Sequence, residues 1–213
     1  ATQPDLGTAL LIAAGGLTVA WLAGVRIKFF ALSGLAFLAL LPIAISFLKP
    51  YQKSRILTFL NPERDPLGAG YQIIQSKIAI GSGGLFGKGF LQGSQSYLDY
   101  LPEKHTDFIF TLFSEEFGFF GSILILALYV IITWRIVQIG NLTRDAFAKL
   151  YCFSFATAFF IYVVVNMCMV LGLIPIVGAP LPILSYGGSS MLAIMIGLGI
   201  VMSCKIHKDE PIG

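Results

Sequence analysis

Four stretches without a single charged residue are the feature that most constrains the fold of this chain. They cover residues 6–25, 29–48, 117–134 and 150–204. Each contains at least 18 residues, and about 20 apolar residues are enough to cross the hydrocarbon core of a bilayer. Only 12% of the 213 residues are charged, whereas soluble domains carry about 25%. The sequence therefore predicts an all-α protein, a polytopic transmembrane helical bundle.

The longest uncharged stretch is too long for one span. Helix-breaking residues occupy its middle, namely Gly172, Pro175, Gly178, Pro180 and Pro182. Because proline removes a helix hydrogen bond, we expect two helices joined by a turn. In total, five spans are predicted, at about residues 7–25, 28–48, 107–134, 147–170 and 187–204, with one long loop at 49–106.

The charges in the short connections predict the orientation. Seven basic residues fall on one side of a five-span serpentine: Arg26, Lys28, Arg135, Arg144, Lys149, Lys205 and Lys208. The positive-inside rule assigns that side to the cytoplasm. The loop 49–106 also carries seven basic residues, but long loops translocate with little regard to charge. We therefore expect an outside N-terminus, an inside C-terminus and an extracytoplasmic loop, and we expect further helices before Ala1.

Composition also argues against two classes of function. The net charge of +3 comes from basic and acidic residues that are mixed along the loops, which is not the basic stripe of a nucleic-acid-binding protein. The three cysteines Cys152, Cys168 and Cys204 lack CxxC spacing. They indicate neither a disulfide framework nor a zinc site.

Two segments of the long loop carry distinct patterns. Residues 71–80 alternate isoleucines with Gln, Ser and Lys, which favours a short amphipathic or re-entrant helix. Residues 81–89 contain five glycines. Such a segment is either a flexible surface loop or a nest of backbone N–H groups that binds an anion. It is not a Walker A loop, because Ser82 stands where that motif requires its first glycine and Gly89 stands where it requires Ser or Thr.

The stretch Leu101–Phe110 is the most informative one. Pro102 cannot continue a helix, whereas Thr106 and Asp107 are good residues for starting one. Helical spacing from Asp107 places three polar side chains on one face, Thr111, Ser114 and Glu115, with Glu116 roughly opposite. Carboxylates inside a membrane usually face a cavity, a partner or a water path. This stripe favours a functional polar site, and for Asp107 the alternative is an acid that complements the helix dipole.

A second polar cluster precedes the last span, Ser185-Tyr-Gly-Gly-Ser-Ser190. It either caps the helix and allows close packing through small residues, or it lines a pocket. Asn166, inside the fourth span, is expected to make an interhelical hydrogen bond.

Taken together, these motifs resemble the SEDS family, which comprises RodA, FtsW and SpoVE. The resemblance is carried, in family order, by residues 3–8, 65–71, 75–84, 101–108, 114–116 and 180–189. It covers nearly the whole chain. The Asp65–Tyr71 stretch is most similar to the RodA branch.

The resemblance implies a peptidoglycan glycosyltransferase that polymerises lipid II during cell elongation and shape maintenance and releases undecaprenyl pyrophosphate. It further implies an outward-facing site in the bacterial cytoplasmic (inner) membrane, a class B penicillin-binding protein as partner, and other elongation-complex membrane proteins nearby. Family members have ten spans, so residues 1–213 are expected to be the C-terminal five.

By the same resemblance, Asp107 in the His-Thr-Asp motif is the expected catalytic base. The residues expected to bind substrate are Lys77, Gly83, Gly84, Lys88, Glu103, Lys104, His105, Thr106, Glu115, Ser185, Tyr186, Gly187, Gly188 and Ser189. The sequence does not identify a cofactor. Asp99, Glu103 and Asp107 offer oxygen ligands for a divalent cation, but without a diagnostic spacing, and no metal site is assigned.

Two other classes of function are compatible with parts of the pattern. A transporter that flips the lipid-linked precursor would explain intramembrane carboxylates and a broken Pro/Gly turn. A non-catalytic scaffold of the cell-wall machinery would use the Gly- and Ala-bearing helix faces for close packing.

Overall fold

Helices form most of the part of the chain that the structure describes. The computed structural model describes residues 6–46, 50–65, 68–93 and 105–209. Within these residues the elements are α1 (Leu6–Leu22), α2 (Ile27–Ser46), α3 (Pro50–Leu60), the 3-10 turn η1 (Pro62–Arg64), α4 (Ala69–Ser82), α6 (Ile109–Leu142), α7 (Ala146–Val170) and α8 (Gly188–Ile206). A helix coincides with each of the five predicted spans, and the described part of the chain contains no strand.

Three of these helices are long and apolar enough to cross a membrane. They are α6 with 34 residues, α7 with 25 and α8 with 19. α1 and α2 are also apolar, with shorter described apolar stretches at Leu11–Leu22 and Ile27–Leu40. Most side chains of α2 are exposed, as lipid-facing side chains are. The fold fits a part of a polytopic membrane bundle.

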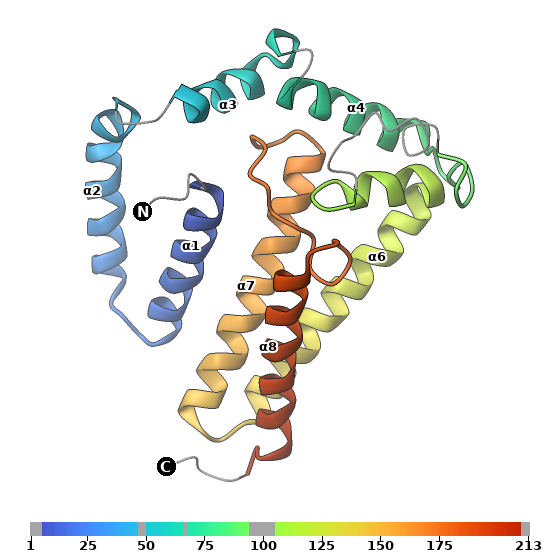
Figure 1. Cartoon of the computed structure of the whole chain (residues 1–213). Helices are drawn as coiled ribbons and strands as arrows, with labels where there is room; N and C mark the ends of the chain where they lie inside the picture. Colours follow the sequence, from blue (N-terminus) through green and yellow to red (C-terminus); the bar gives the residue numbers. More distant parts are fainter. Residues whose placement is uncertain (1–5, 47–49, 66–67, 94–104, 210–213) are drawn as a thin grey trace.

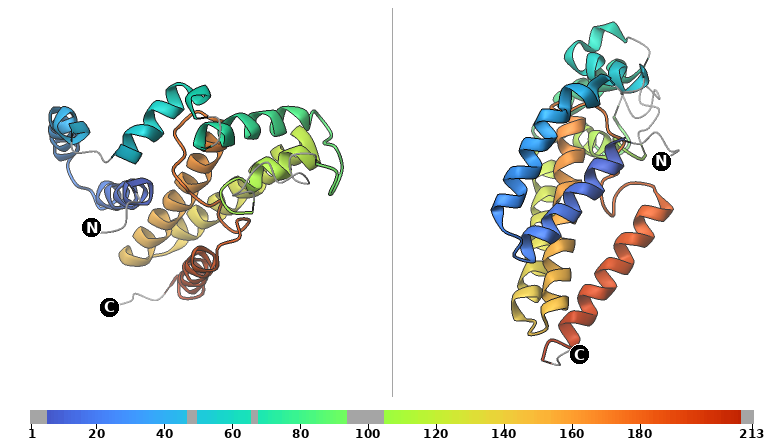
Figure 2. Two further views of the ribbon diagram at one scale, coloured as in Figure 1. Left: turned by 45° about the horizontal axis from the view of Figure 1, so that its top comes forward. Right: turned by 90° about the vertical axis from the view of Figure 1, so that its left-hand side faces the viewer.

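The long helices pack around α7. α6 runs antiparallel to α7, α8 packs against both, and α1 lies along another face of α7 (Figure 1). Two apolar clusters fill the interior. One contains Phe108, Tyr129, Phe159 and Leu181, and the other contains Ile136, Cys152, Val201 and Cys204. α3 and α4 lie across one end of this bundle, as Figure 2 also shows.

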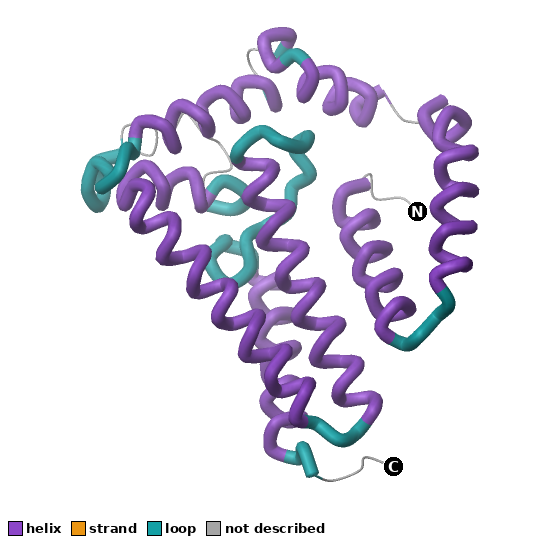
Figure 3. Tube along the Cα trace, turned by 180° about the vertical axis from the view of Figure 1, so that it is seen from behind, coloured by secondary structure: helices purple, strands orange, loops and turns teal. Residues whose placement is uncertain are grey.

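The short connections whose basic residues predict the orientation lie at the opposite end. The α1–α2 corner, the α6–α7 turn and the C-terminal end of α8 all point away from α3 and α4 (Figure 3). This is the arrangement that a serpentine with one positively charged side requires. The membrane side of each end stays a prediction from the charge pattern.

The long loop contains more helix than the sequence predicts. α4 agrees with the short helix expected at residues 71–80, and it buries Ile73, Ser76 and Ala79. α3 and η1 were not predicted, because their residues show neither a long apolar run nor a clear cap. Arg55 of α3 donates a hydrogen bond from Nη1 to the carbonyl of Ile176, 3.1 Å away. The loop helices are therefore tied to the segment between α7 and α8.

α6 is broken at Gly118, which the apolar pattern does not predict. Gly118 has φ 68° and ψ −160°, a conformation that only glycine adopts readily. The short first part of α6 therefore runs at an angle to the rest of the helix (Figure 1). In a continuous helix, the amides of Phe119 and Phe120 would donate to the carbonyls of Glu115 and Glu116. The break leaves these four groups to find other partners.

The glycine-rich segment supplies all four partners. The amides of Lys88 and Gly89 donate to the carbonyls of Glu115 and Glu116, each at 3.0 Å. In return, Phe119 donates to Gly84 at 2.9 Å and Phe120 to Leu85 at 3.2 Å. The glycines therefore allow a close backbone approach rather than flexibility. The Lys88 and Gly89 amides are engaged with carbonyls in this conformation, so they do not form an anion nest.

Gly87 gives the sharpest test of the docking of the glycine-rich segment, residues 81–89, onto the break in α6. It has φ 81°, and a Cβ there would overlap the carbonyl of Glu116. We expect Gly87→Ala to destabilise the protein by about 2 kcal/mol or more, since left-handed backbone costs roughly 1–2 kcal/mol and overpacking roughly 1–3 kcal/mol. The midpoint of thermal unfolding in detergent measures the effect.

Gly81→Ala is the matched control. Gly81 lies within α4, and a Cβ there would meet nothing within 4 Å. Alanine in a helix is favoured over glycine by roughly 0.5–1 kcal/mol, so the midpoint should hold or rise. Equal losses in the two variants would contradict the docking role of Gly87.

Candidate functional site

Three consecutive backbone carbonyls, those of His105, Thr106 and Asp107, are each held by a hydrogen bond from α7 or from the segment between α7 and α8. The amide of Tyr186 donates to His105 at 2.8 Å. The hydroxyl of Ser185 donates to Thr106 at 2.6 Å, and Nδ2 of Asn166 donates to Asp107 at 2.9 Å. We call this arrangement the carbonyl clamp. It fixes the backbone of the turn that carries Asp107.

Asn166 is the centre of the clamp. Its side chain is fully buried, with 0% of the residue exposed. The same Nδ2 donates to the carbonyl of Ala179 at 2.6 Å, so one amide group joins α7, the turn before α6 and the segment that follows α7. Asn166 thus forms a structural hydrogen bond but not the interhelical one that the sequence predicts, because its partners are backbone carbonyls of two loops rather than another helix.

Ser185 is buried and performs two tasks with one hydroxyl. Besides donating to Thr106, its Oγ accepts the amide of Leu181 at 2.6 Å. The side chain therefore supports the turn that carries Asp107 instead of opening into a cavity. Tyr186 has the opposite character, because 84% of the residue is exposed and only its amide belongs to the clamp.

The carboxylate of Asp107 points toward the α7–α8 segment. Its Oδ2 is the atom closest to the position that a Cβ on Gly178 would take, at 3.5 Å. Asp107 and Thr106 are half-buried and His105 is exposed. α6 begins at Ile109 with Phe108 as its N-cap residue, so Asp107 lies in the turn before the helix and not in its first turn as predicted. The turn keeps the carboxylate outside the helix.

A cavity of about 350 Å³ lies beside this turn. His105 and Glu116 are its polar lining residues, and aromatic and aliphatic side chains from α6 and from residues 90–91 form most of the rest. Glu116 is only 9% exposed. Helical spacing counted from Asp107 predicts that Glu116 lies opposite it, but Asp107 precedes the helix, so that spacing does not apply. Glu116 follows Ile109, Leu112 and Phe113 on one face of α6, and it lines the cavity together with His105.

The predicted polar stripe of α6 is buried inside the protein. Thr111 lies 3.0 Å from the hydroxyl of Ser76, and Ser76 donates to the carbonyl of Val170 at 2.6 Å. Ser114 accepts from Ser122 at 2.9 Å. These contacts join α4, α6 and α7. The stripe therefore contributes to packing at this end of the bundle.

Glu115 forms an ion pair with Lys88. Lys88 Nζ lies 2.7 Å from Oε1 of Glu115, whose side chain is 0% exposed, whereas that of Lys88 is 29% exposed. Two residues expected to bind substrate are thus brought together. Their ion pair adds to the backbone bonds between the glycine-rich segment and α6, where Gly83 is buried against Ser114 and Gly84 accepts from Phe119.

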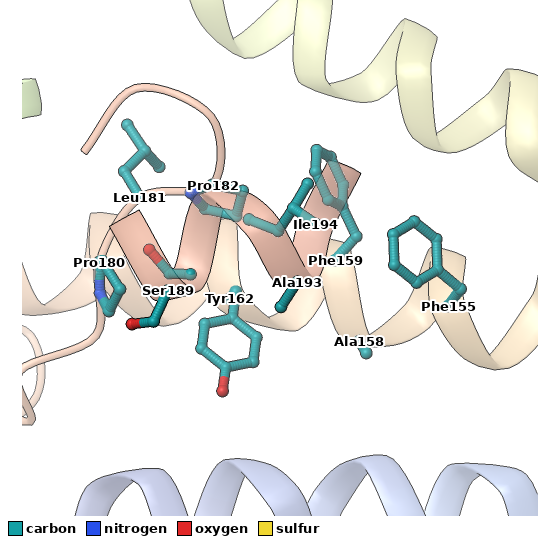
Figure 4. Close-up of a pocket in the computed structure, with 11 residues that line it drawn as sticks. Phe155, Ala158, Phe159, Tyr162, Pro180, Leu181, Pro182, Ser189, Ala193 and Ile194 are labelled. Atoms are coloured by element: carbon teal, nitrogen blue, oxygen red, sulfur yellow. The ribbon is translucent and has the colours of Figure 1, made fainter. Parts of the chain in front are cut away.

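The other expected substrate-binding residues that the structure describes lie on α4 and at the start of α8. Lys77 is exposed, and its amine end lies against Gly172 after α7. Gly187 is the N-cap residue of α8 and Gly188 its first residue. Ser189 lines a groove of about 480 Å³ between α7, α8 and residues 180–182, and Tyr162 is another of its lining residues (Figure 4). Glu103 and Lys104 lie outside the described residues.

The structure leaves the cation hypothesis untested. Asp99 and Glu103, which were to share a cation with Asp107, lie outside the described residues. Among the described residues, no group of three or more His, Cys, Asp or Glu side chains is placed to hold a metal ion.

Sequence reasoning did not place Glu116, Arg55 or Gly178 at the site. For Glu116 the signal was the spacing within α6, since it follows Ile109, Leu112 and Phe113 by seven, four and three positions. No local signal identifies Arg55 or Gly178, because their roles depend on contacts between distant segments.

Comparison with known proteins matches the whole chain to one family. A family model described as "Cell cycle protein", covering FtsW, RodA and SpoVE, matches residues 1–210. The peptidoglycan glycosyltransferase MrdB of Escherichia coli (strain K12) is 48% identical over 209 residues, which are 98% of this chain and 56% of MrdB. Stage V sporulation protein E of Bacillus subtilis (strain 168) is 41% identical over 206 residues, 97% of this chain and 56% of that protein.

The fold of this chain is also similar to a solved structure. It is described under "Structural coordination of polymerization and crosslinking by a peptidoglycan synthase complex", with a TM-score of 0.74 and 37% identity. The match covers 98% of this chain and 57% of that one. The chain thus spans about half the length of the curated relatives that it matches.

Substitution of Asn166 tests the carbonyl clamp. We expect Asn166→Leu to leave the carbonyls of Asp107 and Ala179 buried without this donor, at about 1–3 kcal/mol for each. Hydrogen exchange of the amides at residues 105–111, followed by mass spectrometry in detergent, should become faster.

Thr157→Val is the control on the same helix. Thr157 donates only to the carbonyl of Phe153 within α7, at 2.8 Å, and that carbonyl keeps its place in the helix ladder. Exchange at residues 105–111 should stay at the wild-type rate. Unchanged exchange in Asn166→Leu would rule out the clamp.

Substitution of Lys88 tests whether its ion pair with Glu115 stabilises the protein. Lys88→Met leaves the Glu115 carboxylate buried without its cation, so we expect a loss of about 2 kcal/mol or more. This is less than the roughly 3–5 kcal/mol of a fully buried pair, since Lys88 is partly exposed. The thermal unfolding midpoint in detergent gives the loss, and adding Glu115→Gln should recover more than half of it. No recovery in the double variant would show that the pair does not stabilise the docking.

Proposed function

The chain belongs to the FtsW/RodA/SpoVE family of cell cycle proteins, and we propose that it contributes the general base and part of the substrate site of a peptidoglycan glycosyltransferase. The proposed substrate is lipid II. The observation that carries the proposal is the carbonyl clamp, which holds a half-buried carboxylate in a fixed turn.

Asp107 is the proposed base. A sugar 4-hydroxyl of lipid II attacks the anomeric carbon of the growing glycan, so that a new C–O bond forms while the bond from that carbon to the pyrophosphate oxygen breaks. The hydroxyl proton passes to the Asp107 carboxylate, and undecaprenyl pyrophosphate leaves with the electron pair. A carboxylate can accept the proton when it lies within about 2.6–3.2 Å of the hydroxyl.

The clamp supports this role because a general base must be held in position. Positioning contributes a large part of enzymatic rate enhancement. Three hydrogen bonds to consecutive carbonyls fix the main chain on which the Asp107 side chain stands, and the residue is half-buried rather than enclosed. Asn166 and Ser185 are positioning residues in this scheme.

Two basic side chains border the segment that faces Asp107. Arg55 binds the carbonyl of Ile176, two residues before Gly178, and Lys77 lies against Gly172. Positive charge at this place would stabilise the leaving pyrophosphate. Lys88 contributes less to that task, because it is paired with Glu115.

The groove between α7 and α8 is the proposed place for the lipid tail. Phe155, Phe159 and Ile194 give it an apolar lining, and Ser189 lies near its Pro180–Pro182 side (Figure 4). An isoprenoid chain is compatible with such a surface because it has no polar groups to satisfy.

We further propose that the protein works beside a cross-linking enzyme, a class B penicillin-binding protein, together with other elongation-complex membrane proteins. The support is the likeness to a structure described as a peptidoglycan synthase complex for polymerization and crosslinking. The chain is a multi-pass membrane protein. Its proposed location is the bacterial cytoplasmic membrane, with Asp107 facing outward.

Asp107→Asn tests the base. We expect at least a hundredfold lower rate of lipid II polymerisation by the full-length protein, since general base catalysis contributes about 10²–10⁴-fold. The assay follows glycan strands from purified lipid II by gel electrophoresis. A rate equal to that of the wild type would rule out Asp107 as the base.

Asp145→Asn is the matched control. Asp145 caps α7 by accepting the amide of Ala148 at 2.8 Å, and asparagine is an equally good cap. The same loss of one carboxylate should therefore leave the polymerisation rate within about twofold of the wild type. If Asp107→Asn keeps partner binding and cell shape as well as activity, the scaffold function is favoured instead.

A further inference from the structure

A second polar site lies at the end of the bundle away from Asp107. It is a cavity of about 390 Å³ between α6 and α8, lined by Arg135, Gln138, Ile139, Leu142, Met202, Lys205 and Lys208. We call it the basic cavity. Its volume falls within the roughly 300–1,000 Å³ of ligand-binding pockets. The proposed glycosyl transfer uses none of these residues.

Helical spacing explains why these side chains face one another. On α6, the lining residues follow Arg135 by three, four and seven positions, which places them on one face of the helix. Met202 and Lys205 share a face of α8 in the same way, and Lys208 follows in the turn after Ile206. α6 and α8 pack against each other. The cavity is therefore built on regular elements.

Three cations face this cavity without a carboxylate beside them. Arg135, Lys205 and Lys208 form no ion pair with any residue that the structure describes. Arg135 donates from Nη1 to Oε1 of Gln138 at 3.2 Å, and a guanidinium has further N–H donors. Of the described acidic residues at this end, Asp145 is engaged in the α7 cap, and Asp209 lies beyond Lys208 in the chain.

The same cavity has an apolar side. Leu142 is 65% exposed and Met202 is 50% exposed, and both belong to helices that are apolar enough to cross a membrane. Apolar side chains on such helices face hydrocarbon, whereas the cations near the helix ends reach the headgroup level. A ligand for this cavity should therefore combine an anionic group with an apolar chain.

The frame around the cavity is well packed. Ile136 of α6 and Val201 and Cys204 of α8, the two helices that line it, are buried in one apolar cluster. The amide of Arg144 donates to the carbonyl of Lys208 at 3.1 Å, which ties the turn after α8 to the α6–α7 turn. The cations are thus presented by a rigid part of the bundle.

We propose that the basic cavity binds one anionic phospholipid of the surrounding leaflet. The headgroup phosphate binds Arg135, Lys205 and Lys208, and an acyl chain lies over Leu142 and Met202. Basic pockets between transmembrane helices are suited to lipid phosphates, because anionic lipids concentrate at the cytoplasmic surface, which is where the charge pattern places this end. The inference is independent of the proposed glycosyl transfer.

Lipid titration of the full-length protein, followed by native mass spectrometry in detergent, tests the site. The probe is phosphatidylglycerol, with phosphatidylcholine for comparison. We expect one saturable phosphatidylglycerol site and at least tenfold weaker binding of phosphatidylcholine. Arg135→Gln with Lys205→Gln should weaken phosphatidylglycerol binding about 25-fold, from about fivefold for each cation near a membrane surface. An equal affinity for the two lipids would overturn the proposal.

A matched charge removal separates the cavity from general surface charge. Arg26→Gln with Lys28→Gln removes two cations from the α1–α2 corner, outside the cavity. This variant should bind phosphatidylglycerol within about threefold of the wild type, since the local site is intact. A loss as large as that of the cavity variant would overturn the proposal.

Inorganic phosphate distinguishes a lipid headgroup from a free anion. We expect that millimolar phosphate does not displace phosphatidylglycerol, because the free ion lacks the acyl contact with Leu142 and Met202. Displacement by phosphate alone would show a free-anion site and overturn the lipid assignment. Since all the substituted side chains are exposed, both variants should keep the wild-type unfolding midpoint, which shows that they fold.

Discussion

The need to pair backbone N–H and C=O groups where water is scarce is the constraint on which the rest of this structure depends. In hydrocarbon, an unpaired backbone group costs several kcal/mol, so irregular backbone is tolerated only where protein satisfies it. The break at Gly118 and the turn before α6 are both irregular. The first is satisfied by four hydrogen bonds to the glycine-rich segment, and the second by Asn166, Ser185 and the amide of Tyr186.

This constraint also explains the role of most polar side chains near the turn before α6. Polar residues in an apolar sequence suggest chemistry, yet most of those at this end of the bundle stabilise irregular backbone. Ser185, Asn166 and Ser76 each donate to a backbone carbonyl, and Lys88 pairs with Glu115. Asp107 differs, because its backbone carbonyl is held by Asn166 while the residue as a whole is half-buried. A catalytic carboxylate needs a rigid main chain around it.

The two ends of the bundle are built for different ligands. At the end covered by α3 and α4, a clamped carboxylate, a cavity with Glu116 and His105, and an apolar groove lie on connected elements. At the other end, cations from α6 and α8 face one another beside exposed apolar side chains. The long antiparallel helices α6 and α7 separate these ends, and their packing fixes the position of each.

The sequence by itself determined the class of the protein, the helices at the five predicted spans and the motifs of the family, because charge depletion and proline placement act locally along the chain. It also located Asp107, through the resemblance of its motif. Only the tertiary structure decided which polar residues pair with one another. Asn166 reaches Asp107 across 59 positions and Ser185 reaches Thr106 across 79. The break at Gly118 likewise depends on the glycine-rich segment, since freed backbone groups are stable only when a distant segment supplies their partners.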